Sequence, residues 1–173
     1  QCEDQLSCND YMDITSNLIK SCKKYNVKKF IFTSSTRIYG KNLINSIDED
    51  TELSPDDGYS CVKREIEEYL RATCCSCDMQ GYSLRISNGY GYPVKLETDC
   101  WNLLLMHVCR EAILHSKVVL NSNGKEYKDF VPLNFIVKAI ETCMKQDTNN
   151  SYLTYNIVSG KSLTVREAVK YLI

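Results

Sequence analysis

The feature that most constrains the fold is an alternation of short apolar segments with helical segments of about ten to fifteen residues. Strands are predicted at residues 29–35, 82–86 and 153–158, with a shorter one at 118–120. Helices are predicted at about 14–24, 59–72, 101–115 and 135–143, and a last one begins at the capping box of Thr164 and Glu167. Strands that alternate with helices in this way predict an α/β fold, in which crossover helices cover a parallel sheet.

Two of these segments also predict which residues are buried. Residues 29–35 are apolar enough to form a strand that is buried on both faces. In the first helix, Ile14, Leu18, Ile19 and Cys22 fall on one side, which is therefore the expected core-facing side.

Composition excludes several classes of protein. The 173 residues include 43% hydrophobic and 25% charged residues, as in an ordinary globular domain. A net charge of −1 and a pI near 6.2 argue against a nucleic-acid partner. No apolar run approaches the roughly 18 residues needed to cross a membrane, and the polar segment 1–10 does not resemble a signal peptide. A cytoplasmic protein without membrane attachment is expected.

The ten cysteines allow two interpretations. Cys74, Cys75 and Cys77 are close enough in sequence to suggest a metal or redox site. The alternative is a set of reduced, mostly buried thiols that behave as small hydrophobic side chains, as in cytosolic proteins. We favour the second interpretation and expect no metal site.

The residues with the clearest chemical potential are two serines at the end of a predicted strand, Ser34 and Ser35, and a tyrosine and lysine on the next helix, Tyr59 and Lys63. A spacing of four residues places Tyr59 and Lys63 on the same face of a helix. A lysine ammonium close to a tyrosine phenol favours the phenolate, which can take a proton from a hydroxyl group as hydride leaves its carbon. In open α/β sheets, ligands bind at the carboxyl ends of the strands, where Ser35 is expected. By spacing alone, an ordinary surface pair on a helix is the preferred interpretation of the tyrosine and lysine.

Several segments, taken in order, match a known set of motifs. Residues 27–40 (VKKFIFTSSTRIYG) match VkkfvftSSxxvYG, and the 24 residues from Ser35 to Tyr59 fit the usual gap. Further matches are residues 13–18 to NxxGTxnlL, with Asp13 in place of the asparagine, 47–55 to an i-x-E…P loop, 84–91 to LRxxNxYG, 101–103 to an NL helix start, 124–131 to G…RDFVhV, and 155–167 to YNiGxG…s…E. The chain therefore resembles the extended short-chain dehydrogenases/reductases, specifically the NAD-dependent nucleotide-sugar epimerase/dehydratase family.

This resemblance implies catalytic and cofactor-binding roles. Tyr59 would be the general base, Lys63 its electrostatic partner and a ligand of the nicotinamide ribose, and Ser35 the hydroxyl that orients the substrate. Thr33 and Ser34 would pass the nicotinamide end of the cofactor. The implied cofactor is NAD, with NADP left open, and the implied substrate is a nucleotide sugar.

Three further residues match positions that hold the nucleotide-sugar diphosphate region. Asn88 and Asn102 are candidates on this ground, although each could equally be an ordinary capping or turn asparagine. Lys128 stands where the family usually has an arginine, so it keeps the charge but loses bidentate geometry. Full-length members of the family are expected to be homodimers.

The chain departs from the family pattern in its glycines. Family members carry a GxxGxxG turn whose helix N-terminus receives the pyrophosphate. The seven glycines, at 40, 58, 81, 89, 91, 124 and 160, do not build that motif. We therefore expect a partial Rossmann-type doubly wound sheet, with catalytic residues in 1–90 and part of a small C-terminal substrate lobe in 91–173. We also expect weak binding of NAD.

Within the family, two positions narrow the reaction. Sugar dehydratases usually carry acidic residues immediately before the VYG of the serine motif, where this chain has Thr36 and Arg37. The basic residue argues against dehydration and favours epimerisation, by transient oxidation of a sugar hydroxyl, or simple oxidoreduction. The alternatives are a nucleotide-sugar dehydratase or reductase, or a non-catalytic binding or scaffold protein on the same fold.

Overall fold

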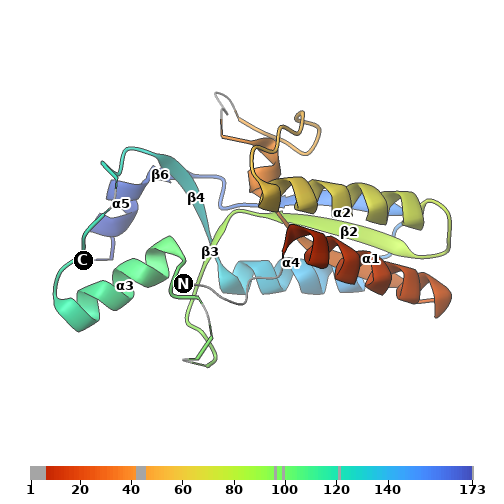
Figure 1. The fold of residues 1–173 in the computed structure, drawn as a ribbon, viewed down its shortest axis with the longest axis horizontal. Helices are drawn as coiled ribbons and strands as arrows, with labels where there is room; N and C mark the ends of the chain where they lie inside the picture. Colours follow the sequence, from red (N-terminus) through yellow and green to blue (C-terminus); the bar gives the residue numbers. More distant parts are fainter. Residues whose placement is uncertain (1–6, 42–45, 96, 99, 121, 173) are drawn as a thin grey trace. The chain divides into compact units, whose positions relative to one another are not determined.

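A computed structural model describes residues 7–41, 46–95, 97, 98, 100–120 and 122–172 (Figure 1). The chain divides into two compact units. The first contains Gln1–Ile86 and Ile140–Asn156, and the second contains Ser87–Ala139 and Ile157–Ile173. Each unit has its own three-stranded sheet.

The sheet of the first unit has the strand order β1-β2-β5. Strand β1 (Lys29–Ser35) runs parallel to β2 (Gln80–Ile86), with Lys29 opposite Gln80. On the other side of β2 lies β5 (Tyr152–Ile157). All three strands were predicted, and the predicted parallel sheet is confirmed. Burial on both faces is a property of the central strand β2 rather than of β1. In the described part of the sheet β1 has one neighbouring strand, and its Thr33 is exposed.

Two helices pack side by side against this sheet (Figure 1). Helix α1 (Cys8–Lys24) begins at a capping box made by Ser7 and Asp10. Helix α2 (Gly58–Cys74) begins at a second capping box, made by Asp57 and Ser60. Both boxes satisfy backbone N–H groups that the first turn of a helix leaves without partners.

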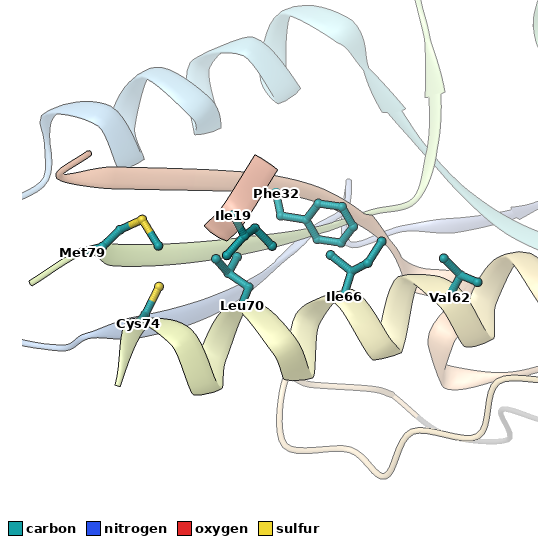
Figure 2. Packing of buried hydrophobic residues seen from close by; sticks show 7 residues of the cluster. All are labelled: Ile19, Phe32, Val62, Ile66, Leu70, Cys74 and Met79. Atoms are coloured by element: carbon teal, nitrogen blue, oxygen red, sulfur yellow. The ribbon is translucent and has the colours of Figure 1, made fainter. Parts of the chain in front are cut away.

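A row of apolar side chains spaced four residues apart joins α2 to the rest of the unit. Val62, Ile66, Leu70 and Cys74 lie along one side of α2 and pack with Ile19, Phe32 and Met79 (Figure 2). Full burial of each of the larger side chains contributes about 1.5–3 kcal/mol. This row holds α2, and with it Tyr59 and Lys63, in a fixed position against β1.

The predicted core face of α1 is only partly correct. Ile19 is fully buried, but Ile14 and Leu18 are exposed. The buried positions are Thr15 and Ile19, which are four residues apart and face α2. The side of the helix that carries Ile14 and Leu18 is rotated away from α2.

The second unit is built from shorter strands. Strand β3 (Asn88–Tyr90) runs parallel to β4 (Tyr127–Pro132), and β4 runs antiparallel to β6 (Ser162–Thr164). None of the three was predicted, because they are three to six residues long and carry polar or charged side chains instead of apolar runs. The predicted strand at 118–120 is wrong. These residues form no regular structure, although Val118 and Leu120 pack against the apolar core of the unit.

The helices complete this second core. Helix α3 (Leu104–His115) starts three residues later than predicted, and α5 (Val165–Lys170) begins at the predicted Thr164–Glu167 capping box. Helix α4 (Leu133–Lys145) is shared between the units. Core side chains from α3, β4 and α5 are Leu105, Val108, Phe130, Val165, Ala168 and Val169. None of the helices in the described ranges is long and apolar enough to span a membrane.

The cysteine cluster contributes to packing. The Cys74 thiol lies in the core of the first unit, where burial raises its pKa to about 12. Cys77, three residues further on, directs its Sγ to the carbonyl of Thr73 at 3.1 Å. The Cys74 side chain is fully buried among apolar neighbours, so it packs as a small hydrophobic side chain. Among the residues that the structure describes, no cluster suited to a metal ion is found.

Candidate active site

Tyr59 and Lys63 occupy the first two turns of α2 and differ sharply in exposure. Tyr59 is 47% exposed, so its ring can reach a ligand, whereas Lys63 is only 6% exposed. Their spacing of four residues places both on the side of the helix that faces the end of β1. The Lys63 ammonium donates a hydrogen bond of 2.9 Å to the backbone carbonyl of Thr33 in that strand.

The environment of the Lys63 ammonium is largely aromatic. It lies 5.5 Å from the centre of the Tyr59 ring and 4.8 Å from the centre of the Phe32 ring. Its second hydrogen bond, of 2.8 Å, is to the hydroxyl of Tyr11 in α1. The structure thus brings the predicted tyrosine and lysine together at the carboxyl end of β1, next to Thr33.

The two serines at the end of β1 have different surroundings. Ser35 caps the short 3₁₀ helix η1 (Thr36–Tyr39), because its Oγ accepts a hydrogen bond of 3.2 Å from the backbone N–H of Arg37. The buried Oγ of Ser34 has no hydrogen-bond partner within the described part of the chain. An unpaired buried hydroxyl costs about 1–3 kcal/mol. Such a hydroxyl beside Thr33 fits the predicted cofactor-binding pair, Thr33 and Ser34.

Arg37 connects the serine side of this region to the tyrosine side. Its backbone N–H bonds to Ser35, and its guanidinium lies 5.1 Å from the centre of the Tyr59 ring. The same guanidinium forms an ion pair with Asp57, the residue that caps α2. Two cationic side chains, Arg37 and Lys63, therefore lie within cation–π distance of Tyr59.

Asp57 is held in its charged form by the start of the helix. The hydrogen bond from the backbone N–H of Ser60 is the largest cause that lowers the pKa of Asp57, and the charge of Arg37 acts in the same direction. The carboxylate also accepts from the Ser60 hydroxyl at 2.9 Å. One aspartate thus both begins the helix that carries Tyr59 and positions the guanidinium above it.

We expect Asp57→Ala to lower the free energy of unfolding by about 1–2 kcal/mol at neutral pH, since an N-cap is lost. Because the folded-state pKa of Asp57 is lowered, its contribution is present above the unfolded-state pKa of about 3.9 and is lost as the pH falls through the folded-state value. The difference in free energy of unfolding between Asp57→Ala and the unmodified chain should therefore become smaller as the pH falls. Urea unfolding at several pH values measures it. Asp56→Ala, in an exposed ion pair with Lys41, is the matched control and should change little. A loss that does not vary with pH would contradict this role.

A buried polar network fixes α2 against β2. Arg85 of β2 and Glu67 of α2 form a salt bridge of 2.8 Å, and both side chains are buried. Arg85 also donates to the Tyr39 hydroxyl at 2.7 Å. Glu67 follows Lys63 by four residues and Tyr59 by eight, so all three share one face of α2. The salt bridge therefore sets the rotation of the helix that presents Tyr59 and Lys63.

The three residues predicted to bind the diphosphate region lie in the second unit. Asn88 is exposed in β3, and its side-chain amide donates to the backbone carbonyl of Asp129 at 2.9 Å. Asn102 is exposed in the turn that precedes α3, and Lys128 is half-buried in β4, opposite Leu163. Their proposed binding roles stay predictions.

Tyr11, whose hydroxyl accepts a hydrogen bond from Lys63, was not predicted as a site residue. A signal was available. In the pattern NxxGTxnlL the asparagine stands four residues before the threonine, so alignment on Thr15 assigns that position to Tyr11 and not to Asp13. Spacing along the helix would have shown that Tyr11 and Thr15 share the face that packs against α2.

Comparison with known proteins shows the fold and the family of this chain. The fold of a Rossmann-like parallel sheet is shared with UDP-N-acetylglucosamine 4-epimerase from Methanobrevibacter ruminantium M1, at a TM-score of 0.79 and 27% identity over 91% of this chain and 50% of that one. Residues 5–157 match the family model of the NAD dependent epimerase/dehydratase family. The chain belongs to this family.

Curated relatives include enzymes of two kinds. The dTDP-D-glucose 4,6-dehydratase of Dictyostelium discoideum is 27% identical, over 92% of this chain and 38% of that protein. The UDP-glucose 4-epimerase of the same organism is also 27% identical, over 90% of this chain and 49% of that protein. The chain therefore spans half or less of the length of these relatives.

Proposed function

We propose that this chain is part of an NAD-dependent nucleotide-sugar epimerase. The observation that carries the proposal is the Arg37 guanidinium above the Tyr59 ring, at the position where sugar dehydratases usually have an acidic residue. Loss of water from a sugar requires a group that can give and take protons, and arginine stays protonated in proteins. A fixed positive charge beside Tyr59 instead suits a reaction that needs only the tyrosine to exchange a proton.

The residues divide the work as follows. Tyr59 takes the proton of a sugar hydroxyl, and the Lys63 ammonium offsets the negative charge on the phenol oxygen that does so. Ser35 donates to or accepts from the same sugar oxygen and orients it. NAD, when bound, would supply the group that takes up the hydride of the sugar carbon and provides it again to the opposite face of the resulting carbonyl. Tyr59 then gives back its proton, so the sugar is isomerised with no net oxidation.

Other side chains would hold the ligands. Thr33 and the unpartnered hydroxyl of Ser34 suit the nicotinamide end of NAD. Asn88, Asn102 and Lys128 supply two amides and one positive charge for a nucleotide diphosphate. The same proposal includes a homodimeric full-length protein and a cytoplasmic location. The exposed Ile14 and Leu18 of α1 support the first, and the free thiols of the described cysteines support the second.

Product analysis tests the proposed reaction. The purified chain is incubated with millimolar NAD and a panel of UDP- and dTDP-hexoses, and the products are followed by mass spectrometry and proton NMR. We expect a product of unchanged mass with one inverted ring carbon. Tyr59→Phe should lower the rate by about 10²–10⁴-fold, since the general base is lost. The control is Tyr25→Phe, an exposed tyrosine at the end of α1.

A product lighter by one water would instead support a dehydratase, the activity named for the Dictyostelium discoideum relative. In that case Arg37→Glu should raise the rate, whereas for an epimerase it should lower it, because the charge beside Tyr59 is reversed. A complete lack of turnover with every sugar, at NAD concentrations that calorimetry shows to saturate the chain, would favour the non-catalytic alternative.

A further inference from the structure

The Lys63 ammonium is a buried charge with no acidic partner among the residues that the structure describes. Only 6% of Lys63 is exposed, and a buried ammonium is unfavourable unless its charge and its N–H groups are compensated. Among the ion pairs of the described residues, none includes Lys63. Some other arrangement must therefore stabilise this charge.

Aromatic rings and neutral oxygens supply the compensation. The centres of the Tyr11 and Phe32 rings each lie 4.8 Å from Lys63 Nζ, and that of Tyr59 lies 5.5 Å away. We call these three rings the aromatic cage. Cation–π attraction is strongest for a desolvated cation, which describes this ammonium. Tyr11 contributes chiefly through its hydroxyl, which accepts a hydrogen bond of 2.8 Å from Nζ.

Local structure explains why Tyr11 reaches this point. Tyr11, Thr15 and Ile19 are spaced four residues apart and share the face of α1 that packs against α2. Thr15 and Ile19 are buried in that contact, and Tyr11 continues the same face one turn earlier, beside the start of α2. The packing of the two helices therefore fixes where the Tyr11 ring and hydroxyl can lie.

We propose that Tyr11 is a positioning residue for the proposed reaction: it holds the Lys63 ammonium beside Tyr59 from the neighbouring helix. The inference rests on the proposed function only in assigning a purpose to that ammonium. The matching family motif has asparagine at this position, which can accept a hydrogen bond but has no ring, so the complete aromatic cage is a feature of this chain. A lysine side chain has four rotatable methylene groups, so without such a hold its ammonium would sample many positions.

The arrangement also leaves the ammonium able to act on a ligand. An ammonium has three N–H groups, and the described residues accept two of them, at the Tyr11 hydroxyl and the Thr33 carbonyl. The third is available to the Tyr59 oxygen or to a hydroxyl of a bound sugar or ribose. Tyr11 thus orients the group while leaving it one donor.

NMR of the ammonium groups in the chain labelled with ¹⁵N-lysine tests the proposal without any catalysis. A caged, hydrogen-bonded ammonium exchanges its protons slowly and is shifted by ring currents, whereas those of exposed lysines exchange too fast to be seen. We expect a slowly exchanging, ring-shifted Lys63 signal, identified by its loss in Lys63→Met. In Tyr11→Phe the exchange should be about tenfold faster, the factor for losing one ordinary hydrogen bond, with the ring shift retained. In Tyr11→Leu the exchange should be faster too, and the part of the ring shift that Tyr11 contributes should be lost, while the part from Phe32 and Tyr59 remains.

Two controls separate positioning from general loosening and from failure of the proposed function. Lys29 donates to the carbonyls of Met144 and Gln146 in the same unit, so its signal should be unchanged in both Tyr11 variants. Tyr59→Phe removes the hydroxyl that catalysis would need but keeps the ring, so the Lys63 signal should persist even if the chain is no epimerase. The proposal is overturned if Lys63 gives no slowly exchanging signal, if Tyr11→Phe leaves the exchange unchanged, or if Lys29 changes equally.

Discussion

Replacing Arg85 with methionine should lower the free energy of unfolding by about 3–5 kcal/mol, the cost of leaving a buried charge without its partner. Arg85 and Glu67 are only 5% and 4% exposed, and the guanidinium makes hydrogen bonds of 2.8–3.3 Å to both carboxylate oxygens. Burial acts to lower the pKa of Arg85, but the hydrogen bonds and charge of Glu67 outweigh it and raise that pKa. Arg85 therefore stays charged in the folded protein, and its removal leaves the buried Glu67 side chain without its partner.

The double variant Arg85→Met, Glu67→Leu should be more stable than Arg85→Met alone, because no buried charge is then left unpaired. It should not recover fully, since Arg85 also donates to the Tyr39 hydroxyl and to the carbonyl of Glu49. Urea unfolding followed by circular dichroism measures the free energy of unfolding of the unmodified chain, of Arg85→Met and of the double variant. The matched control is Arg64→Met, which breaks an exposed ion pair with Glu68 on the same helix and should cost about 0.5 kcal/mol or less. Equal losses of stability in Arg85→Met and Arg64→Met would contradict the conclusion that burial makes the Arg85–Glu67 pair important.

The sequence predicted those parts of the fold in which apolar periodicity and burial coincide. Strand β1 and helix α2 fall within two residues of the predicted ranges, because one is an apolar run and the other repeats its apolar side chains every four residues. The short strands of the second unit were not predicted, because they lack such an apolar pattern. Strand β4 carries Lys128 and Asp129 beside Phe130, so its pairing depends on partners distant in sequence and not on its own pattern.

In the candidate site, too, local spacing was predictable and long-range contacts were not. The side chains of Tyr59 and Lys63 can be assigned to one helical face from spacing alone. The contacts that hold them join residues far apart in sequence, as with Lys63 and Tyr11 or Glu67 and Arg85. These pairings follow from how α1, α2 and β2 pack, and no local pattern specifies that packing. The sequence therefore indicated the candidate groups but not the contacts that position them.

Titration of a 173-residue polypeptide of this sequence with NAD should show binding several orders of magnitude weaker than that of a family member with a GxxGxxG turn. In this fold the backbone N–H groups of that turn and the positive end of the helix behind it hold the pyrophosphate. An acidic residue after the next strand holds the adenine ribose. The seven glycines of the chain do not form such a turn, and the residues proposed to touch NAD, Thr33, Ser34, Tyr59 and Lys63, would reach only its nicotinamide end.

The size of the effect follows from the missing hydrogen bonds. Each bond to a charged group contributes about 1.5–3 kcal/mol, so the loss of two weakens binding by about 10²–10⁴-fold. Isothermal titration calorimetry measures this directly, and Lys63→Met is the matched variant, since it should abolish whatever weak binding the nicotinamide end provides. Micromolar one-to-one binding that survives Lys63→Met would mean that the chain holds NAD through residues other than those proposed. Micromolar binding that Lys63→Met abolishes would keep the site but show that Lys63, Tyr59 and the serine pair bind NAD far more strongly than their few hydrogen bonds allow.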